Sequence, residues 1–179
     1  MNGLILIGGR SKRMGSDKSL IDYHGLPQRE WLYRLLQPFC KQVFFSCRTD
    51  QIKEIADYQY IVDLEEDIGP LGGLRSAFQY DTSSAWFVVA CDMPHITVET
   101  IKYLLQHRQP QSIATAFLNP ATHLPEPLCT IWETRAAEQV NDALQRGNYS
   151  PTRLLQRPDV ALIAPVDEQW LMNINSPQK

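Results

Sequence analysis

The sequence predicts an α/β fold in which a mainly parallel sheet is covered by helices on both faces. Short apolar runs alternate with segments of helical periodicity, and glycines close several of these runs. The chain has 179 residues, enough for one sizeable core. No internal repeat or low-complexity linker divides it, so we expect a single domain over residues 1–179.

Apolar runs rich in β-branched and aromatic residues predict strands at 4–7, 43–47, 60–62, 84–90, 112–117, 126–132 and 159–164, with a shorter strand-like piece at 19–23. Apolar residues at helical spacing predict helices at 27–37, 49–58, 72–80, 98–107, 135–145 and 151–156. Thr49 or Asp50 would cap the second of these helices, and Thr97 is the better-placed cap of the fourth.

Composition argues against several classes of protein. The net charge of −3 is unlike that of a general nucleic-acid binder. No apolar run approaches a membrane span, and no signal peptide is recognisable, so we expect a cytoplasmic protein. The cysteines are scattered without a C-x-x-C pair, which predicts reduced structural thiols at Cys40, Cys47, Cys91 and Cys129.

The stretch from residue 4 to residue 18 carries the strongest functional signal. A buried strand ends at Gly8 and Gly9, whose backbone can approach a ligand closely, and four cations follow at Arg10, Lys12, Arg13 and Lys18. This combination suits a polyphosphate, although a solvated basic turn is the plainer alternative. The spacing matches neither a P-loop nor the dinucleotide fingerprint.

Two further stretches suit a nucleotide. Three glycines beside Pro70 open a helix at residues 69–73, which suggests a backbone pressed against a flat ligand. Asp92 ends the strongest predicted strand, where open α/β sheets bind ligands, and one carboxylate with phosphate oxygens suits Mg²⁺. Asp92 could instead cap the following helix, and Asp63, at another strand end, could simply face water.

The residues Leu6-Ile7-Gly8-Gly9, Arg13-Met14-Gly15 and Asp17-Lys18 resemble the signature L-A-G-G-x-x-x-R-M-G-x-D-K of the molybdenum cofactor guanylyltransferase family of nucleotidyltransferases. Three more anchors resemble that family, in its order: G-P-L-G-G at 69–73, C-D-M-P at 91–94 and N-I-N at 173–175. The resemblance covers nearly the whole chain. It implies a Rossmann-like three-layer α/β/α sandwich with some antiparallel strands near the C-terminus.

The resemblance implies transfer of GMP from GTP to the phosphate of molybdopterin or the molybdenum cofactor, with release of pyrophosphate. Arg13 and Lys18 would neutralise the triphosphate, and Asp92 would hold Mg²⁺. Asn175 would be a second metal contact, and Asn173 and Asn175 would contact the acceptor. The implied nucleotide-binding residues are Leu6, Ile7, Gly8, Gly9, Lys18, Ser46, Asp63, Pro70, Leu71, Gly73 and Asp92.

The chain departs from the family pattern at three informative positions. Ile7 replaces alanine, Ser46 replaces asparagine, and Glu126 replaces histidine or glutamine near the acceptor. The form of the glycine segments favours GTP over CTP by analogy. The implied partners are GTP, the molybdopterin substrate and, by analogy, enzymes that make or receive the cofactor, with no nucleic acid and no membrane.

Two alternatives stay open. A cytidylyltransferase or a sugar-phosphate nucleotidyltransferase of the same fold would share the glycine loop and differ in base and acceptor. A regulatory or carrier protein would bind the nucleotide without turnover, as the three departures would allow. A flavodoxin-like module has little support, because its phosphate loops are hydroxyl-rich and seldom this basic.

Overall fold

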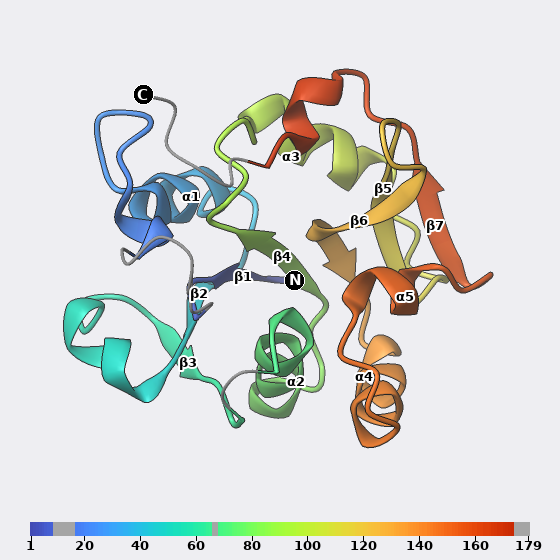
Figure 1. Cartoon of the computed structure of the whole chain (residues 1–179), viewed down its shortest axis with the longest axis horizontal. Coiled ribbons are helices and arrows are strands. Elements are labelled where there is room, and N and C mark those ends of the chain that lie inside the picture. The colour runs from blue at the N-terminus through green and yellow to red at the C-terminus, as the bar shows by residue number, and fades with distance from the viewer. Residues whose placement is uncertain (9–16, 66–67, 174–179) are drawn as a thin grey trace.

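A computed structural model describes residues 1–8, 17–65 and 68–173 of the chain. These residues form a sheet of seven strands in the order β3-β2-β1-β4-β6-β5-β7 (Figure 1). The strands are β1 (Asn2–Leu6), β2 (Val43–Cys47), β3 (Tyr60–Val62), β4 (Trp86–Ala90), β5 (Ala114–Asn119), β6 (Leu124–Trp132) and β7 (Val160–Ile163).

The sheet is mainly parallel. β1 pairs in parallel with β2 and with β4, β2 pairs in parallel with β3, and β5 does so with β7. β6 runs antiparallel to both of its neighbours, β4 and β5. The predicted mainly parallel sheet with an antiparallel component towards the C-terminus is therefore confirmed.

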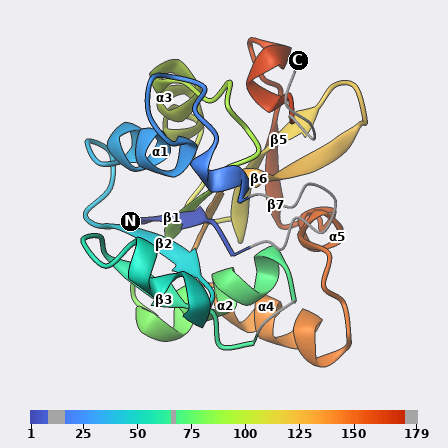
Figure 2. The same ribbon diagram turned by 60° about the vertical axis from the view of Figure 1, so that its left-hand side comes forward.

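Helices cover both faces of this sheet (Figures 1 and 2). One face carries α1 (Gln28–Leu36), α3 (Val98–Gln106) and the 3₁₀ helix η3 (Glu168–Leu171), and the other carries α2 (Pro70–Tyr80), α4 (Ala136–Gln145) and α5 (Pro151–Leu155). Two further 3₁₀ helices are η1 (Lys18–Leu20) and η2 (Thr49–Glu54). In the described part of the chain, no helix has the length and apolar character needed to cross a membrane.

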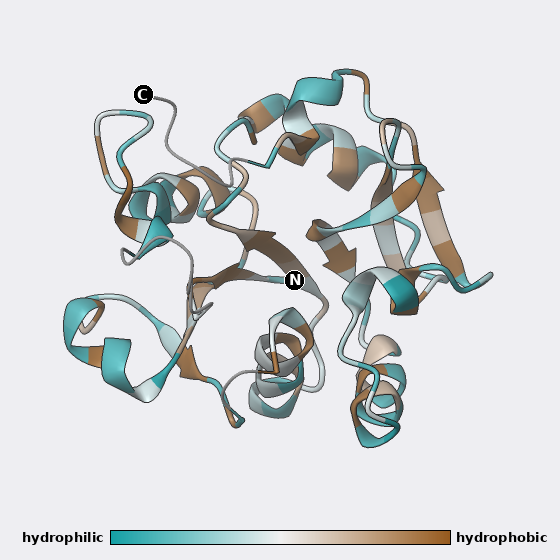
Figure 3. Cartoon of the chain, viewed as in Figure 1, coloured by the Kyte–Doolittle hydropathy of each residue, from teal (hydrophilic) through white to brown (hydrophobic). Residues whose placement is uncertain are grey.

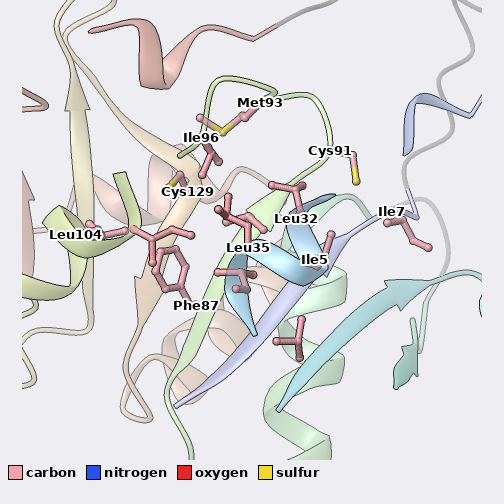
Figure 4. Packing of buried hydrophobic residues seen from close by; sticks show 14 of the residues in the cluster. Ile5, Ile7, Leu32, Leu35, Phe87, Cys91, Met93, Ile96, Leu104 and Cys129 are labelled. Atoms are coloured by element: carbon pink, nitrogen blue, oxygen red, sulfur yellow. The ribbon is translucent and has the colours of Figure 1, made fainter. Parts of the chain in front are cut away.

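The alternation of side chains along the strands creates two apolar layers. Ile5 and Phe87 pack towards α1 and α3 (Figure 4), whereas Leu4 and Trp86 pack towards α2 and α4. All four side chains are fully buried. Each such burial stabilises the fold by roughly 1.5–3 kcal/mol. Figure 3 shows the result as hydrophobic strands between helices whose hydrophilic residues lie on the outside.

Two local predictions are wrong. Residues 19–23 are not a strand: the Asp17 carboxylate accepts from the Ser19 N–H at 2.9 Å and caps η1 instead. The helix predicted over 49–58 is the shorter η2, and its N-cap is Arg48 rather than Thr49 or Asp50. Gln51 decides this boundary, because its Oε1 accepts from the Arg48 N–H at 3.1 Å.

Thr97 caps α3, as the sequence predicts. The Thr97 hydroxyl accepts from the Thr100 N–H at 3.4 Å, and the Thr100 hydroxyl accepts from the Thr97 N–H at 3.1 Å. This reciprocal pair satisfies two N–H groups that would otherwise lack partners in the first turn. Asp92 is therefore not needed as the cap of this helix.

We expect Thr97→Ala to lower the free energy of unfolding by about 1 kcal/mol, because the N-cap acceptor is lost. Urea denaturation at equilibrium measures the change, and Thr97→Ser, which keeps the hydroxyl, should remain close to the wild type. A neutral Thr97→Ala combined with a loss of that size in Asp92→Asn would contradict the assignment of the cap.

Candidate active site

A cavity of about 540 Å³ opens at the edge of the sheet where β1, β2, β3 and β4 end. These four strands are parallel, so their carboxyl ends meet at one edge. From β1 the chain goes to β2 and β3 on one side, while β4 lies on the other, which makes this the point where α/β sheets bind ligands. The lining residues are Leu6, Ile7, Gly8, Asp17, Lys18, Ser19, Ser46, Arg48, Asp63, Glu65, Gly69, Pro70, Ala90, Cys91, Asp92 and Leu128.

One wall of the cavity is built around the Asp63 carboxylate. The Ser46 hydroxyl donates to Asp63 Oδ1 at 2.6 Å. A Cβ on Gly8 would lie 2.7 Å from Asp63 Oδ2, and a Cβ on Gly73 would collide with Ser46 Oγ. A Cβ at either position would displace one of these polar groups, so the two glycines allow their close approach. Ser46 lines the cavity but donates its hydroxyl hydrogen to Asp63, so it orients that carboxylate.

The segment G-P-L-G-G contributes to this wall in two ways. Gly69, with φ +80, and Pro70 line the cavity at the start of α2. Leu71 and Gly73 do not line it: Leu71 is fully buried in the apolar layer under α2, and Gly73 makes room for Ser46. These two residues support the wall from behind rather than forming its surface.

Asp92 stands at the end of β4, and Lys18 of η1 lines the same cavity. Burial raises the pKa of the Asp92 carboxyl, and the positive charge of Lys18 opposes this rise. Asp92 Oδ1 is buried and accepts no hydrogen bond from the described part of the chain. A buried carboxylate oxygen without a donor is costly unless a cation or ligand completes it.

Apolar anchors fix the loop that carries Asp92. Met93 and Ile96 lie in the apolar layer under α1 and α3 (Figure 4). On the outer side, His24 Nε2 lies 2.9 Å from the Pro94 carbonyl, and its ring stacks on Trp31 with centroids 4.3 Å apart. The carboxylate is thus held by contacts on both sides of its loop.

Ile7, which stands where the family usually has alanine, is accommodated in the hydrophobic core. It is 4% exposed and belongs to the apolar layer under α1, together with Cys91, which follows the neighbouring strand β4 (Figure 4). Its backbone N–H donates to the Ser46 carbonyl at 3.1 Å, so the strand pairing continues past β1. The larger side chain fills the core and leaves the backbone at the cavity in place.

Sequence reasoning missed several lining residues, of which Arg48 and Asp17 are the most informative. Arg48 Nη1 donates to the Gly8 carbonyl at 2.6 Å, and its guanidinium also pairs with Asp50. Arg48 follows β2 directly, so its position at a parallel strand end was the available signal. Asp17 was noticed only as part of the glycine-loop signature.

Glu126 lies at the same sheet edge, on β6. It is 5% exposed, and its Oε1 accepts from the Leu128 N–H at 2.9 Å. Burial raises the pKa of Glu126 to about 7 despite that hydrogen bond, and the negative charge of Asp92 adds to the rise. The position that departs from the family pattern near the acceptor is therefore a buried titratable group beside the cavity.

The predicted acceptor contacts are not brought to this cavity by the described residues. Asn173 is exposed and does not line the cavity. Gly9, Arg13 and Asn175 lie outside the described residues, so their predicted roles remain predictions.

The described residues fit a metal that arrives with a phosphate ligand. They contain no group of three or more His, Cys, Asp or Glu side chains that could hold an ion alone. Asp92 offers one buried carboxylate oxygen without a donor among them. This fits Mg²⁺, which takes one or two carboxylates and fills its remaining positions with water and phosphate oxygens.

We expect Glu126→Gln to change how stability depends on pH. The folded pKa of about 7 lies above the ordinary value of 4.5, so the folded state binds more protons in this interval and wild-type stability falls as pH rises through it. The difference between these two pKa values corresponds to a loss of about 3 kcal/mol in the free energy of unfolding once Glu126 is fully ionised. An amide at this position cannot ionise, so the variant should gain stability relative to the wild type as pH rises from 4.5 through about 7, as urea denaturation would measure. A constant difference across this range would contradict the assignment.

Comparison with known proteins places this chain among nucleotidyltransferases. The model of the MobA-like NTP transferase domain matches residues 3–162. A molybdenum cofactor guanylyltransferase of Pseudomonas fluorescens is 33% identical over 98% of the chain and 89% of its own length. A molybdenum cofactor biosynthesis bifunctional protein of Synechocystis is 35% identical over 98% of the chain, which spans about half (51%) of that relative's length.

Solved structures agree with this fold. Molybdopterin-guanine dinucleotide biosynthesis protein A of Archaeoglobus fulgidus superimposes with a TM-score of 0.81 at 24% identity, covering 99% of this chain and 93% of that one. A Mycobacterium tuberculosis protein of the same fold, at 13% identity and a TM-score of 0.64 over 92% of this chain and 87% of that one, was solved as a complex with manganese. The predicted family and three-layer fold are confirmed: the chain belongs to the MobA-like NTP transferase family.

Proposed function

We propose that this chain transfers GMP from GTP to the terminal phosphate of molybdopterin, or of its molybdenum-loaded form. An oxygen of the acceptor phosphate forms a bond to the α-phosphorus of GTP. The bond from that phosphorus to the oxygen bridging to the β-phosphate breaks, and pyrophosphate leaves with the electron pair. The observation that carries the proposal is that Lys18 and Asp92, whose Oδ1 is buried, line one cavity at the ends of the parallel strands, where the charge of Lys18 acts on the Asp92 carboxyl.

The wall formed by Gly8, Ser46 and Asp63 supports guanine as the base. A carboxylate accepts hydrogen bonds, and guanine offers N1–H and 2-amino donors on one edge. Ser46 holds Asp63 Oδ1 through a 2.6 Å hydrogen bond, so the carboxylate is oriented before a ligand arrives. Cytosine does not present this pair of donors.

The chemistry asks the protein for positioning and charge compensation. The attacking phosphate is already an anion, so no strong general base is required, and the difficulty is to bring anions together. The ammonium group of Lys18 would attract the triphosphate, and Asp92, held in place by its anchored loop, would contribute through the cation that it binds. Arg13 would add a second cation, as the family signature implies.

Asp92 would hold Mg²⁺ through its buried oxygen, with Asn175 as a second contact. The ion, when bound, supplies charge neutralisation of the triphosphate and of the leaving pyrophosphate. Asp92 must be ionised for this role, and its raised pKa means that loading with the metal releases protons at low pH.

Further parts of the proposal concern the setting of the reaction. We take residues 1–179 as one nucleotidyltransferase domain, which the continuous sheet of the described residues supports.

The cysteines are free thiols, as in a reducing compartment, which supports a place in the cytoplasm. The protein partners would be enzymes that make the cofactor or receive its dinucleotide form. Asn173, which lies outside the cavity, and Asn175 would contact the acceptor only if it extends beyond the nucleotide cavity.

Nucleotide selectivity tests the proposed function. We expect GTP with Mg²⁺ to raise the melting temperature more than ATP, CTP or UTP, since a ligand at a hundredfold excess over Kd stabilises the native state by about 2.7 kcal/mol. Incubation with molybdopterin should then release pyrophosphate. Selective stabilisation by CTP would point to a cytidylyltransferase. Binding of GTP without pyrophosphate release would point to a regulatory or carrier protein.

We expect Asp92→Asn to lower Mg²⁺-dependent turnover by about 10³-fold, because a principal electrostatic contact of the transition state is lost. Stability at neutral pH should be equal or higher, since the variant no longer buries a charge. Steady-state kinetics and urea denaturation of the same preparation measure both effects. Near-normal turnover that still depends on Mg²⁺ would show that Asp92 does not hold the metal.

A further inference from the structure

Gln51 makes three hydrogen bonds from a buried position beside the cavity. Its Oε1 accepts from the Arg48 N–H at 3.1 Å. Its Nε2 donates to the Ile7 carbonyl at 3.1 Å and to Asp17 Oδ2 at 3.1 Å. The side chain is 3% exposed. Only this orientation of the amide satisfies all three partners, since the reverse would turn its carbonyl towards two acceptors.

The two acceptors belong to different walls of the cavity. Ile7 directly follows β1 and precedes Gly8, which lies against Asp63. Asp17 caps η1, the 3₁₀ turn that carries Lys18. The side-chain amide of Gln51 therefore connects the end of β1, through the Ile7 carbonyl, with the start of η1, through the Asp17 carboxylate. These two partners come before and after residues 9–16 in the sequence.

The third hydrogen bond of Gln51 also fixes its side chain. Gln51 lies at the third position of η2, and its carbonyl oxygen caps the N-terminus of that helix through Arg48. Arg48 in turn donates from its side chain to the Gly8 carbonyl at 2.6 Å. Arg48 and Gln51, at the junction of β2 and η2, thus fix the Ile7 and Gly8 carbonyls and the Asp17 carboxylate relative to one another.

We propose that Gln51 is a positioning residue that sets the separation between the Ile7–Gly8 backbone and Lys18. The inference rests on the proposed function, in which the wall of Gly8, Ser46 and Asp63 receives the base of the nucleotide and Lys18 receives the phosphates. A ligand that spans both walls depends on that separation, whereas a ligand that occupies one wall does not. Misplacement of a binding group by about 1 Å costs catalysis as much as 10²-fold.

The test compares GTP with guanosine. GTP would contact both the wall of Gly8, Ser46 and Asp63, here called the base wall, and Lys18 on the other side, whereas guanosine would occupy the base wall alone. In Gln51→Met, which keeps the length of the side chain and removes its hydrogen bonds, affinity for GTP should fall by about tenfold or more while affinity for guanosine changes little. Turnover at saturating substrates, measured well below the melting temperature, should fall by about 10²-fold. Calorimetric titration and steady-state kinetics provide these values.

Thr115→Val is the matched control for loss of a buried polar group. Thr115 is fully buried in β5, and its hydroxyl accepts from the Gln109 N–H at 2.9 Å, away from the cavity. We expect this variant to lose stability while its turnover and its ratio of GTP to guanosine affinity match the wild type. A purely structural role of Gln51 predicts that Gln51→Met behaves in the same way, and that result would overturn the inference.

A rescue experiment tests the geometry directly. Gln51→Glu turns a carboxylate towards the Asp17 carboxylate, so turnover should fall at least as far as in Gln51→Met. Adding Asp17→Asn supplies an amide donor opposite the introduced carboxylate and should restore turnover about tenfold over Gln51→Glu alone, since one hydrogen bond to a charged group is regained. No restoration, together with an unchanged affinity ratio, would overturn the inference.

The outcomes separate this inference from the proposed function. The comparison uses whichever nucleoside triphosphate stabilises the wild type most, together with its own nucleoside. If that nucleotide is CTP, the guanylyl assignment fails while Gln51 is tested unchanged. If GTP is selected and the Gln51 variants keep the wild-type affinity ratio, only the positioning role fails. If none of the four nucleotides binds, both proposals fail.

Discussion

The structure of the site depends on keeping a carboxylate where water has little access. Asp92 is half-buried and its Oδ1 is fully buried, so its ionised form costs free energy unless positive charge compensates it, and its raised pKa reflects this cost. Lys18 supplies part of the compensation from the start of η1, whereas Asp92 follows β4. The geometry that brings Lys18 towards Asp92 is therefore as important as either residue.

The apolar layers supply that geometry. Alternate strand residues pack into the two layers, and the loop after β4 is drawn inward by Met93 and Ile96 (Figure 4). These buried side chains cannot move without opening space in a close-packed interior. A site on such a loop gains rigidity from the core while its polar atoms remain at the cavity. Stability and function thus share the same contacts on this side of the sheet.

Sequence patterns predicted the parts of the fold that depend on periodicity. The buried strands and the longer helices were found because apolar residues recur at spacings of two or of three to four. The elements that the sequence missed or misjudged are the short 3₁₀ helices: η1 and η3 were not predicted, and η2 was predicted as a longer helix. The caps of η1 and η2 are local hydrogen bonds from the Ser19 and Arg48 N–H groups to Asp17 and Gln51, and helices this short leave no apolar periodicity that would reveal them.

The candidate site was also predicted unevenly. Asp63 and Asp92 end parallel strands, so topology alone brings them to one edge. Arg48 occupies an equivalent position and could have been found by the same argument. The support given by Gly73 to Ser46, by contrast, appears only once α2 is packed on β2. Leu71 belongs to the core because its side chain lies on the buried face of α2, and the motif G-P-L-G-G alone does not indicate which face of the helix is buried.

The three departures from the family pattern have different consequences in the structure. Ile7 fills the core, and Ser46 orients Asp63, so both changes are accommodated within the wall that would receive the nucleotide. Glu126 is different, because it adds a buried group with a pKa of about 7 within the electrostatic reach of Asp92. The charge at Glu126 therefore varies near neutral pH, whereas Ser46 orients the Asp63 carboxylate through a hydrogen bond. Of the three departures, Glu126 is therefore the one that makes the charge at this sheet edge depend on pH.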